Sequence, residues 1–77
     1  MEQTKTATAK QLLHSGDLRG ALAIFRTFRI GFTKAERRTL EIASDSLNGH
    51  GQFYRSLGID TDAEIRKSRA ILSAKHY

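Results

Sequence analysis

Five cationic side chains flank Gly31 in the middle of the chain, and guanidinium and ammonium groups are suited to binding phosphate. Arg26 and Arg29 are three residues apart, which places them on one side of a helix. Lys34 and Arg38 are four residues apart and share one side of the helix that follows. Cations on both sides of one turn can straddle phosphate groups. We therefore predict an anion-binding surface formed by Arg26, Arg29, Lys34, Arg37 and Arg38.

A second, smaller basic group lies on the last predicted helix. Arg66 and Arg69 are three residues apart and are further candidate binding residues, with Lys67 between them. The alternative is a solvated helix face, because Asp62 can form an ion pair with Arg66 four residues later. The sequence leaves both interpretations open.

The same alternative applies to the cations around Gly31. Arg37 can pair with Glu41, and Arg38 can pair with Glu41 or, less directly, with Asp45. Such pairs would neutralise part of the predicted surface. The case for an anionic partner therefore depends on where these two acidic side chains lie in the fold.

The chain carries thirteen Lys and Arg residues against eight Asp and Glu residues, a formal net charge of +5. Long-range attraction at such a charge favours anionic partners. The predicted partner is nucleic acid or a nucleoprotein complex. The alternative is a host protein, with the chain acting as an inhibitor or adaptor that docks on an acidic surface. A homodimer also stays open, because a chain of 77 residues buries only a small core.

No residue pattern predicts catalysis, a metal site or a cofactor site. There are no cysteines, and the histidines at 14, 50 and 76 include no helical i,i+4 pair. His50 lies between two glycines near Tyr54, so it is the histidine best placed to contact a ligand. The acidic residues between positions 60 and 64 are explained by capping and by the positive end of a helix. We therefore expect a non-enzymatic protein that works by binding.

The elements that position these cations are expected to be helices, because the patterning is helical throughout and proline is absent. The length predicts a single domain over residues 1–77. A first helix is expected over residues 4–15, ended by Gly16, and a second over residues 18–29, capped by Asp17. The second helix should pack against the first in an antiparallel hairpin through one apolar stripe, formed by Leu18, Ala21, Leu22, Phe25 and Phe28.

A third helix is expected over residues 34–48, with Leu40, Ala43 and Leu47 on its buried side. It should begin with a capping box, in which Thr33 and Glu36 satisfy reciprocal backbone amides. A short helix over residues 52–57 follows. The last helix is expected to begin with a second capping box, formed by Thr61 and Glu64.

The predicted fold class is therefore all-α, a compact bundle of four helices plus one short helix. The phenylalanines Phe25, Phe28, Phe32 and Phe53 are expected in its core. Gly20 lies within the second helix, where glycine is unfavourable, and we expect it to allow a close contact with another helix.

The start of the third helix offers backbone amides as an additional anion site. Together with the second helix and residues 30–33, it loosely resembles a helix-turn-helix DNA reader. Its recognition face would carry no Asn or Gln before Asn48, so phosphate contact is favoured over base readout. That face would present Lys34, Arg37, Arg38 and Glu41.

Residues 9–25 resemble the second half of a tetratricopeptide repeat. The matching residues are Ala9, Leu12, Gly16, Asp17, Leu18, Ala21, Leu22 and Phe25. The aromatic residue of the repeat's first helix and a second copy, at a period of about 34 residues, are missing. The resemblance therefore implies a helical hairpin and not a solenoid.

Residues 24–38, together with residues 52–58, resemble small proteins encoded by phages and mobile elements. The resemblance implies a protein that acts by binding during host takeover or counter-defence. It transfers no functional residues to this chain.

The sequence also predicts no membrane span, because no apolar run approaches the roughly 20 residues that a span needs. The polar start of the chain carries no signal-peptide core. A cytoplasmic location is therefore expected, in the host cell if a phage encodes the chain.

Overall fold

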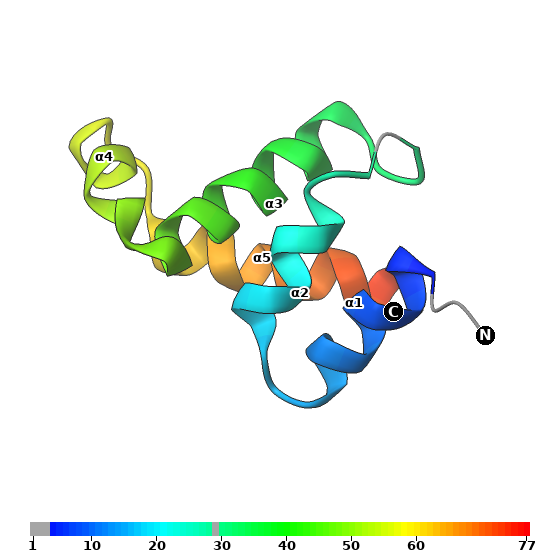
Figure 1. Ribbon diagram of the computed structural model, residues 1–77. Helices are drawn as coiled ribbons and strands as arrows, with labels where there is room; N and C mark the ends of the chain where they lie inside the picture. Colours follow the sequence, from blue (N-terminus) through cyan, green and yellow to red (C-terminus); the bar gives the residue numbers. More distant parts are fainter. Residues whose placement is uncertain (1–3, 29) are drawn as a thin grey trace.

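The protein is an all-α bundle in a computed structural model that describes residues 4–28 and 30–77 (Figure 1). Four helices and one short helix are present, which confirms the predicted fold class. A kinked segment, η1, in which Gly49 adopts φ +94°, joins the third helix to the short one. The elements in chain order are α1 (Lys5–His14), α2 (Leu18–Phe25), α3 (Lys34–Asp45), η1 (Ser46–His50), α4 (Gly51–Ser56) and α5 (Thr61–Ala74).

Helices α1 and α2 form the predicted antiparallel hairpin (Figure 1). Gly16 adopts φ +92°, the left-handed conformation that ends α1, and the Asp17 carboxylate caps α2 by accepting from the Gly20 amide at 2.9 Å. A Cβ atom at Gly20 would lie 2.5 Å from Asp17 Oδ2. Gly20 therefore makes room for the capping carboxylate, a reason for glycine at this position that the sequence pattern did not predict.

The core forms where α2, α3 and α5 meet. Leu22 and Phe25 of α2, Leu40 of α3 and Leu72 of α5 are fully buried. The Phe25 ring also contacts the rings of Phe28, Phe32 and Tyr77, with centroids 4.8 to 6.3 Å apart. The predicted stripe of α2 is confirmed for Leu18, Ala21, Leu22 and Phe25, and Phe32 is buried as expected. Phe28 packs on the core but lies beyond the end of α2 and is only half-buried.

Tyr77 is a core residue that the pattern did not predict. His76 adopts φ +66°, and this turn brings the Tyr77 amide to the Leu72 carbonyl at 3.0 Å. The Tyr77 ring thereby packs between Phe25 and Phe32. Its backbone oxygen lies 2.9 Å from His14 Nε2 on α1.

Helices α3 and α5 pack against each other along most of their length (Figure 1). Small side chains are fully buried in both helices, at Ala43 and Ser44 in α3 and at Ser68 in α5. Lys75, which follows α5, forms an ion pair with Glu36 in the first turn of α3 at 3.3 Å. The two helices therefore run in opposite directions, and α4 lies at the far end of α3.

Three predicted helix boundaries differ from the structure. Helix α2 ends at Phe25 and not near residue 29, because the amides of Thr27 and Phe28, which follow it, bond to carbonyls only three residues back. Eight residues then separate α2 from α3, which is longer than the three- to four-residue turn of a helix-turn-helix. Helix α3 ends at Asp45, after which η1 begins.

The third boundary concerns the start of α5, where the cap is Asp60 and not Thr61. The Asp60 carboxylate accepts from the Ala63 amide at 3.1 Å. Thr61 is the first helical residue and is buried. A carboxylate one residue upstream therefore replaces the predicted capping box.

Candidate anion-binding site

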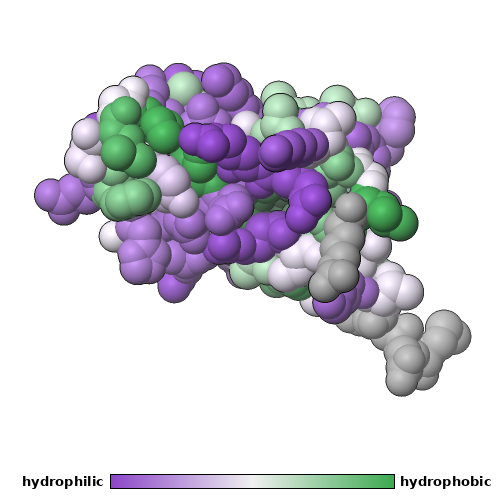
Figure 2. Space-filling view, turned by 90° about the horizontal axis from the view of Figure 1, so that it is seen from above, coloured by the Kyte–Doolittle hydropathy of each residue, from purple (hydrophilic) through white to green (hydrophobic). Residues whose placement is uncertain are grey.

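An open groove of about 830 Å³ lies between the end of α2 and the exposed side of α3. We call it the cationic groove. Figure 2, viewed onto this side, shows hydrophilic side chains gathered across the middle of the face. The groove is lined by Arg26, Lys34, Ala35, Arg37, Arg38 and Glu41. Four of the predicted binding residues are thus brought to one surface, and they come from both sides of the Gly31 turn.

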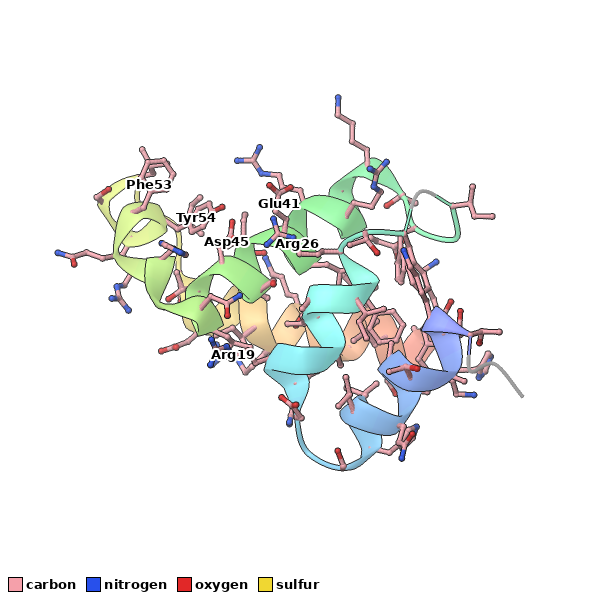
Figure 3. The ribbon with its side chains drawn as sticks, viewed as in Figure 1. Arg19, Arg26, Glu41, Asp45, Phe53 and Tyr54 are labelled. Carbon is pink, nitrogen blue, oxygen red and sulfur yellow. The ribbon has the colours of Figure 1, made fainter. Side chains whose placement is uncertain are left out.

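Arg26 does not contribute a free charge to the groove, because it binds two carboxylates of α3 (Figure 3). Its Nη1 atom donates to Asp45 Oδ1 at 2.7 Å, and its Nη2 atom lies 3.8 Å from Glu41 Oε1. The Tyr54 hydroxyl of α4 donates to the other Asp45 oxygen at 2.6 Å. Asp45 therefore joins α2, α3 and α4 through two charge-assisted hydrogen bonds.

The position of Arg26 corrects the predicted pairing on α3. The alternative left open by the sequence was that Glu41 and Asp45 pair with Arg37 and Arg38, but both carboxylates lie against Arg26 instead. Within the described residues, neither arginine takes part in an ion pair, and both are exposed. Lys34 is likewise exposed and free of a carboxylate partner there. These three cations of α3 remain available to an anion.

The N-terminus of α3 is already occupied by a carboxylate of its own chain. Glu36 Oε1 accepts from the Thr33 amide at 2.8 Å, and Thr33 Oγ1 accepts from the Glu36 amide at 3.1 Å, which confirms the predicted capping box. The Thr33 amide, with Lys75 nearby, holds the pKa of Glu36 below its ordinary value despite the effect of burial. The capping box therefore uses two of the amides at this end of α3, and the anion site expected there stays a prediction.

The remaining predicted binding residues lie outside this surface. Arg66 and Arg69 are exposed on α5 and do not line the cationic groove. The predicted ion pair between Asp62 and Arg66 does not form. Within the described part of α5, the ion pair is instead between Lys67 and Glu64, at 3.5 Å. Arg29 lies outside the described residues.

A smaller hollow, of about 220 Å³, opens beside the groove between α3 and α4. We call it the apolar pocket; its lining residues are Arg38, Glu41, Ile42, Phe53, Tyr54, Leu57 and Ile59. Arg38 and Glu41 line both hollows. Figure 2 shows hydrophobic side chains at the α4 end, directly beside the hydrophilic groove. The two hollows therefore form one continuous surface.

Phe53 was predicted in the core, but 62% of it is exposed, and 63% of Leu57 is exposed. In Figure 3 the Phe53 ring points outward from α4, whereas Tyr54 turns toward Asp45. Phe53 and Leu57 are four positions apart, a spacing that places two residues on one face of a helix. That spacing identifies an apolar face, but it does not tell whether another element covers it.

The described residues show no gathered set of metal ligands. His14, His50 and His76 are all exposed, and residues 4–28 and 30–77 hold no group of three or more His, Asp or Glu that could bind a metal ion. In the same residues no helix is both long and apolar enough to cross a membrane.

Burial raises the pKa of the Asp45 carboxyl, but the hydrogen bonds from Tyr54 and Arg26 outweigh burial and hold this pKa below its ordinary value. The bonded carboxylate therefore stabilises the fold above the unfolded-state pKa of about 4, and this contribution is lost as the pH falls through the folded pKa. The hydrogen bond to Asp45, followed by burial, raises the pKa of Tyr54 to about 12.

We expect Tyr54→Phe to lower the free energy of unfolding by about 1 kcal/mol near neutral pH, because it removes this hydrogen bond. A raised folded pKa means that the neutral phenol stabilises the fold below about pH 10 and loses this effect between about pH 10 and 12. Urea unfolding at about pH 8 and about pH 11 measures the difference. Tyr77→Phe is the control, since the Tyr77 hydroxyl makes no hydrogen bond to the described residues. A Tyr54→Phe variant that loses as much stability at high pH as the wild type would contradict this assignment.

Comparison with known proteins found no match to a protein family, a curated protein or a solved structure. We therefore infer the function from the chemistry of the surface alone.

Proposed function

We propose that this chain is a non-enzymatic binding protein that contacts the phosphate backbone of nucleic acid, directly or within a nucleoprotein complex, through the cationic groove. The observation that carries the proposal is the set of three unpaired cations on α3. Lys34, Arg37 and Arg38 line one groove and form no ion pair with the described residues. Of the nearby carboxylates, Asp45 is held by Arg26 at 2.7 Å, and Glu41, which also lines the groove, lies 3.8 Å from Arg26. Cations without carboxylate partners are free to replace the counterions of a phosphate chain.

The distribution of acidic side chains supports the same proposal. Glu36 is bound by the Thr33 amide and Lys75, and Glu64 is bound by Lys67. Asp17 and Asp60 cap helices. These carboxylates are therefore engaged elsewhere and form no ion pair with Lys34, Arg37 or Arg38. The eight-residue connection between α2 and α3 is longer than the turn of a helix-turn-helix. This length favours contact with phosphates over readout of bases by an inserted helix.

Binding to a short DNA duplex should be strongly salt-dependent. Three phosphate contacts predict a fall in affinity of about 40-fold between about 50 and 200 mM salt. Arg37→Gln/Arg38→Gln should reduce that fall to about fourfold and should weaken binding at low salt at least tenfold. Fluorescence anisotropy of a labelled duplex measures both effects.

Lys5→Gln/Lys10→Gln is the matched control for this experiment. Both lysines are exposed on α1, outside the groove, and their loss changes the net charge by the same amount. The control should retain the salt dependence of the wild type. If no nucleic acid binds at low salt, or if the two double variants lose affinity equally, the groove is not a phosphate-binding site.

A second candidate function is docking on an acidic protein as an inhibitor or adaptor. The aliphatic wall of the apolar pocket, formed by Ile42, Leu57 and Ile59, favours it, because such a wall suits an apolar side chain of a partner. Capture of partners from a host lysate with and without nuclease separates the two functions. A partner that is retained after nuclease treatment supports protein docking, and one that is lost supports nucleic acid.

A further inference from the structure

The exposed ring of Phe53 lies where the cationic groove meets the apolar pocket. Arg38 lines both hollows, and Phe53 lines the pocket. Phe53 and Tyr54 pack edge to face, with ring centroids 5.3 Å apart, while most of the Phe53 side chain stays exposed. Lone exposed apolar residues are common on protein surfaces, but this ring lines the same pocket as Arg38, which forms no ion pair with the described residues.

We propose that the chain prefers single-stranded nucleic acid, with the phosphates of the strand along the cationic groove and an unpaired base stacked on Phe53. This inference rests on the proposed function and names its substrate class. A cationic groove beside an exposed aromatic ring is the combination by which proteins hold single strands, because every base has a π-face. A duplex keeps its bases stacked on each other and therefore uses only the cations.

Three observations favour a base over an apolar protein side chain at Phe53. The pocket is small enough to take one planar group, at about 220 Å³. Its cationic rim, at Arg38, is shared with the groove that would hold the phosphates. Tyr54 already uses its hydroxyl on Asp45, so the surface offers stacking and charge but little hydrogen-bonding selectivity. The expected binding is therefore tolerant of base sequence.

The experiment compares a labelled oligothymidylate and an oligouridylate of about twelve nucleotides with a DNA duplex of about the same length. Phe53→Leu keeps the apolar bulk but removes the ring, and it should weaken binding to the single strand that the wild type prefers by about tenfold. Phe53→Trp keeps a ring and should retain wild-type affinity. Ile30→Ala, which shortens an exposed apolar side chain outside both hollows, should alter affinity less than twofold. Duplex affinity should be the same in all four proteins, because only the cations contact it.

Each outcome separates this inference from the proposed function. Equal loss of single-strand and duplex affinity in Phe53→Leu, or no loss in either, overturns the stacking inference while the proposed function stands. If Phe53→Leu loses neither affinity, the exposed face of Phe53 instead fits a protein partner or a second copy of the chain. No binding to any strand or duplex at low salt overturns both proposals. Size-exclusion chromatography of each variant confirms an unchanged oligomeric state, and circular dichroism confirms the fold. A preference between the thymidylate and the uridylate assigns the strand to DNA or RNA.

Discussion

Phe25→Ala should remove most of the free energy of unfolding and bring the chain close to its unfolding midpoint in water at room temperature. Phe25 is fully buried, and its ring contacts Phe28, Phe32 and Tyr77. Removing a fully buried phenylalanine side chain costs about 3–5 kcal/mol, as lost transfer free energy plus the cavity that remains. A 77-residue domain has about 5 kcal/mol of total stability. The expected loss is therefore nearly the whole stability of the fold.

Urea unfolding followed by far-ultraviolet circular dichroism measures this effect, and Phe53→Ala is the matched control. It removes the same atoms from a side chain that is largely exposed, so the stability should change by less than about 0.5 kcal/mol. The comparison tests whether the core lies where α2, α3 and α5 meet and not at α4. Similar midpoints for the two variants would contradict the placement of Phe25 at its centre.

The helices were predictable because their signals are local. The capping box at Thr33, the cap at Asp17 and the left-handed Gly16 each depend on residues within one turn of a helix. The error at the start of α5 is also local and amounts to one residue. Asp60 and Thr61 are both good N-cap residues, and residue types alone do not decide between two neighbours. The buried stripe of α2 followed from its period.

The parts that failed depend on contacts between distant residues. Tyr77 enters the core only because α5 ends beside the α1–α2 hairpin. Phe53 stays exposed because α4 projects beyond the elements that cover the core (Figure 1). No local pattern records either fact, since both depend on which elements become neighbours.

The candidate site also combines features set by local spacing with features set by contacts between distant residues. The side of α3 that carries Lys34 and Arg38 was predictable from helical spacing. The ion pairs were not, because Arg26 reaches Asp45 across nineteen positions of sequence, whereas i,i+4 reasoning considers only neighbours on one helix. This long-range pair matters most, because it decides which cations of the groove are free.

Asp45→Asn should therefore weaken the fold and strengthen anion binding at the same time. The variant loses the charge that Arg26 and Tyr54 bind, and the free energy of unfolding should fall by about 2 kcal/mol. Arg26 keeps only Glu41, at 3.8 Å and largely exposed, and such a pair contributes little. A fourth cation of the groove is then free, and affinity for a nucleic-acid strand should rise by about tenfold at low salt.

Asp62→Asn is the control for Asp45→Asn. It distinguishes the effect of releasing Arg26 from the effect of a change in net charge alone. Asp62 is exposed on α5 and takes part in no ion pair with the described residues, so its loss changes the total charge by the same amount. Unfolding stability should stay within about 0.5 kcal/mol of the wild type, and affinity within about twofold, because Asp62 is exposed and lines neither the groove nor the apolar pocket. Equal gains in affinity for the two variants would show that Arg26 does not reach the strand. A gain confined to Asp45→Asn, with a steeper salt dependence, is the expected result because the same carboxylate that ties α2, α3 and α4 together also withholds one cation from the groove.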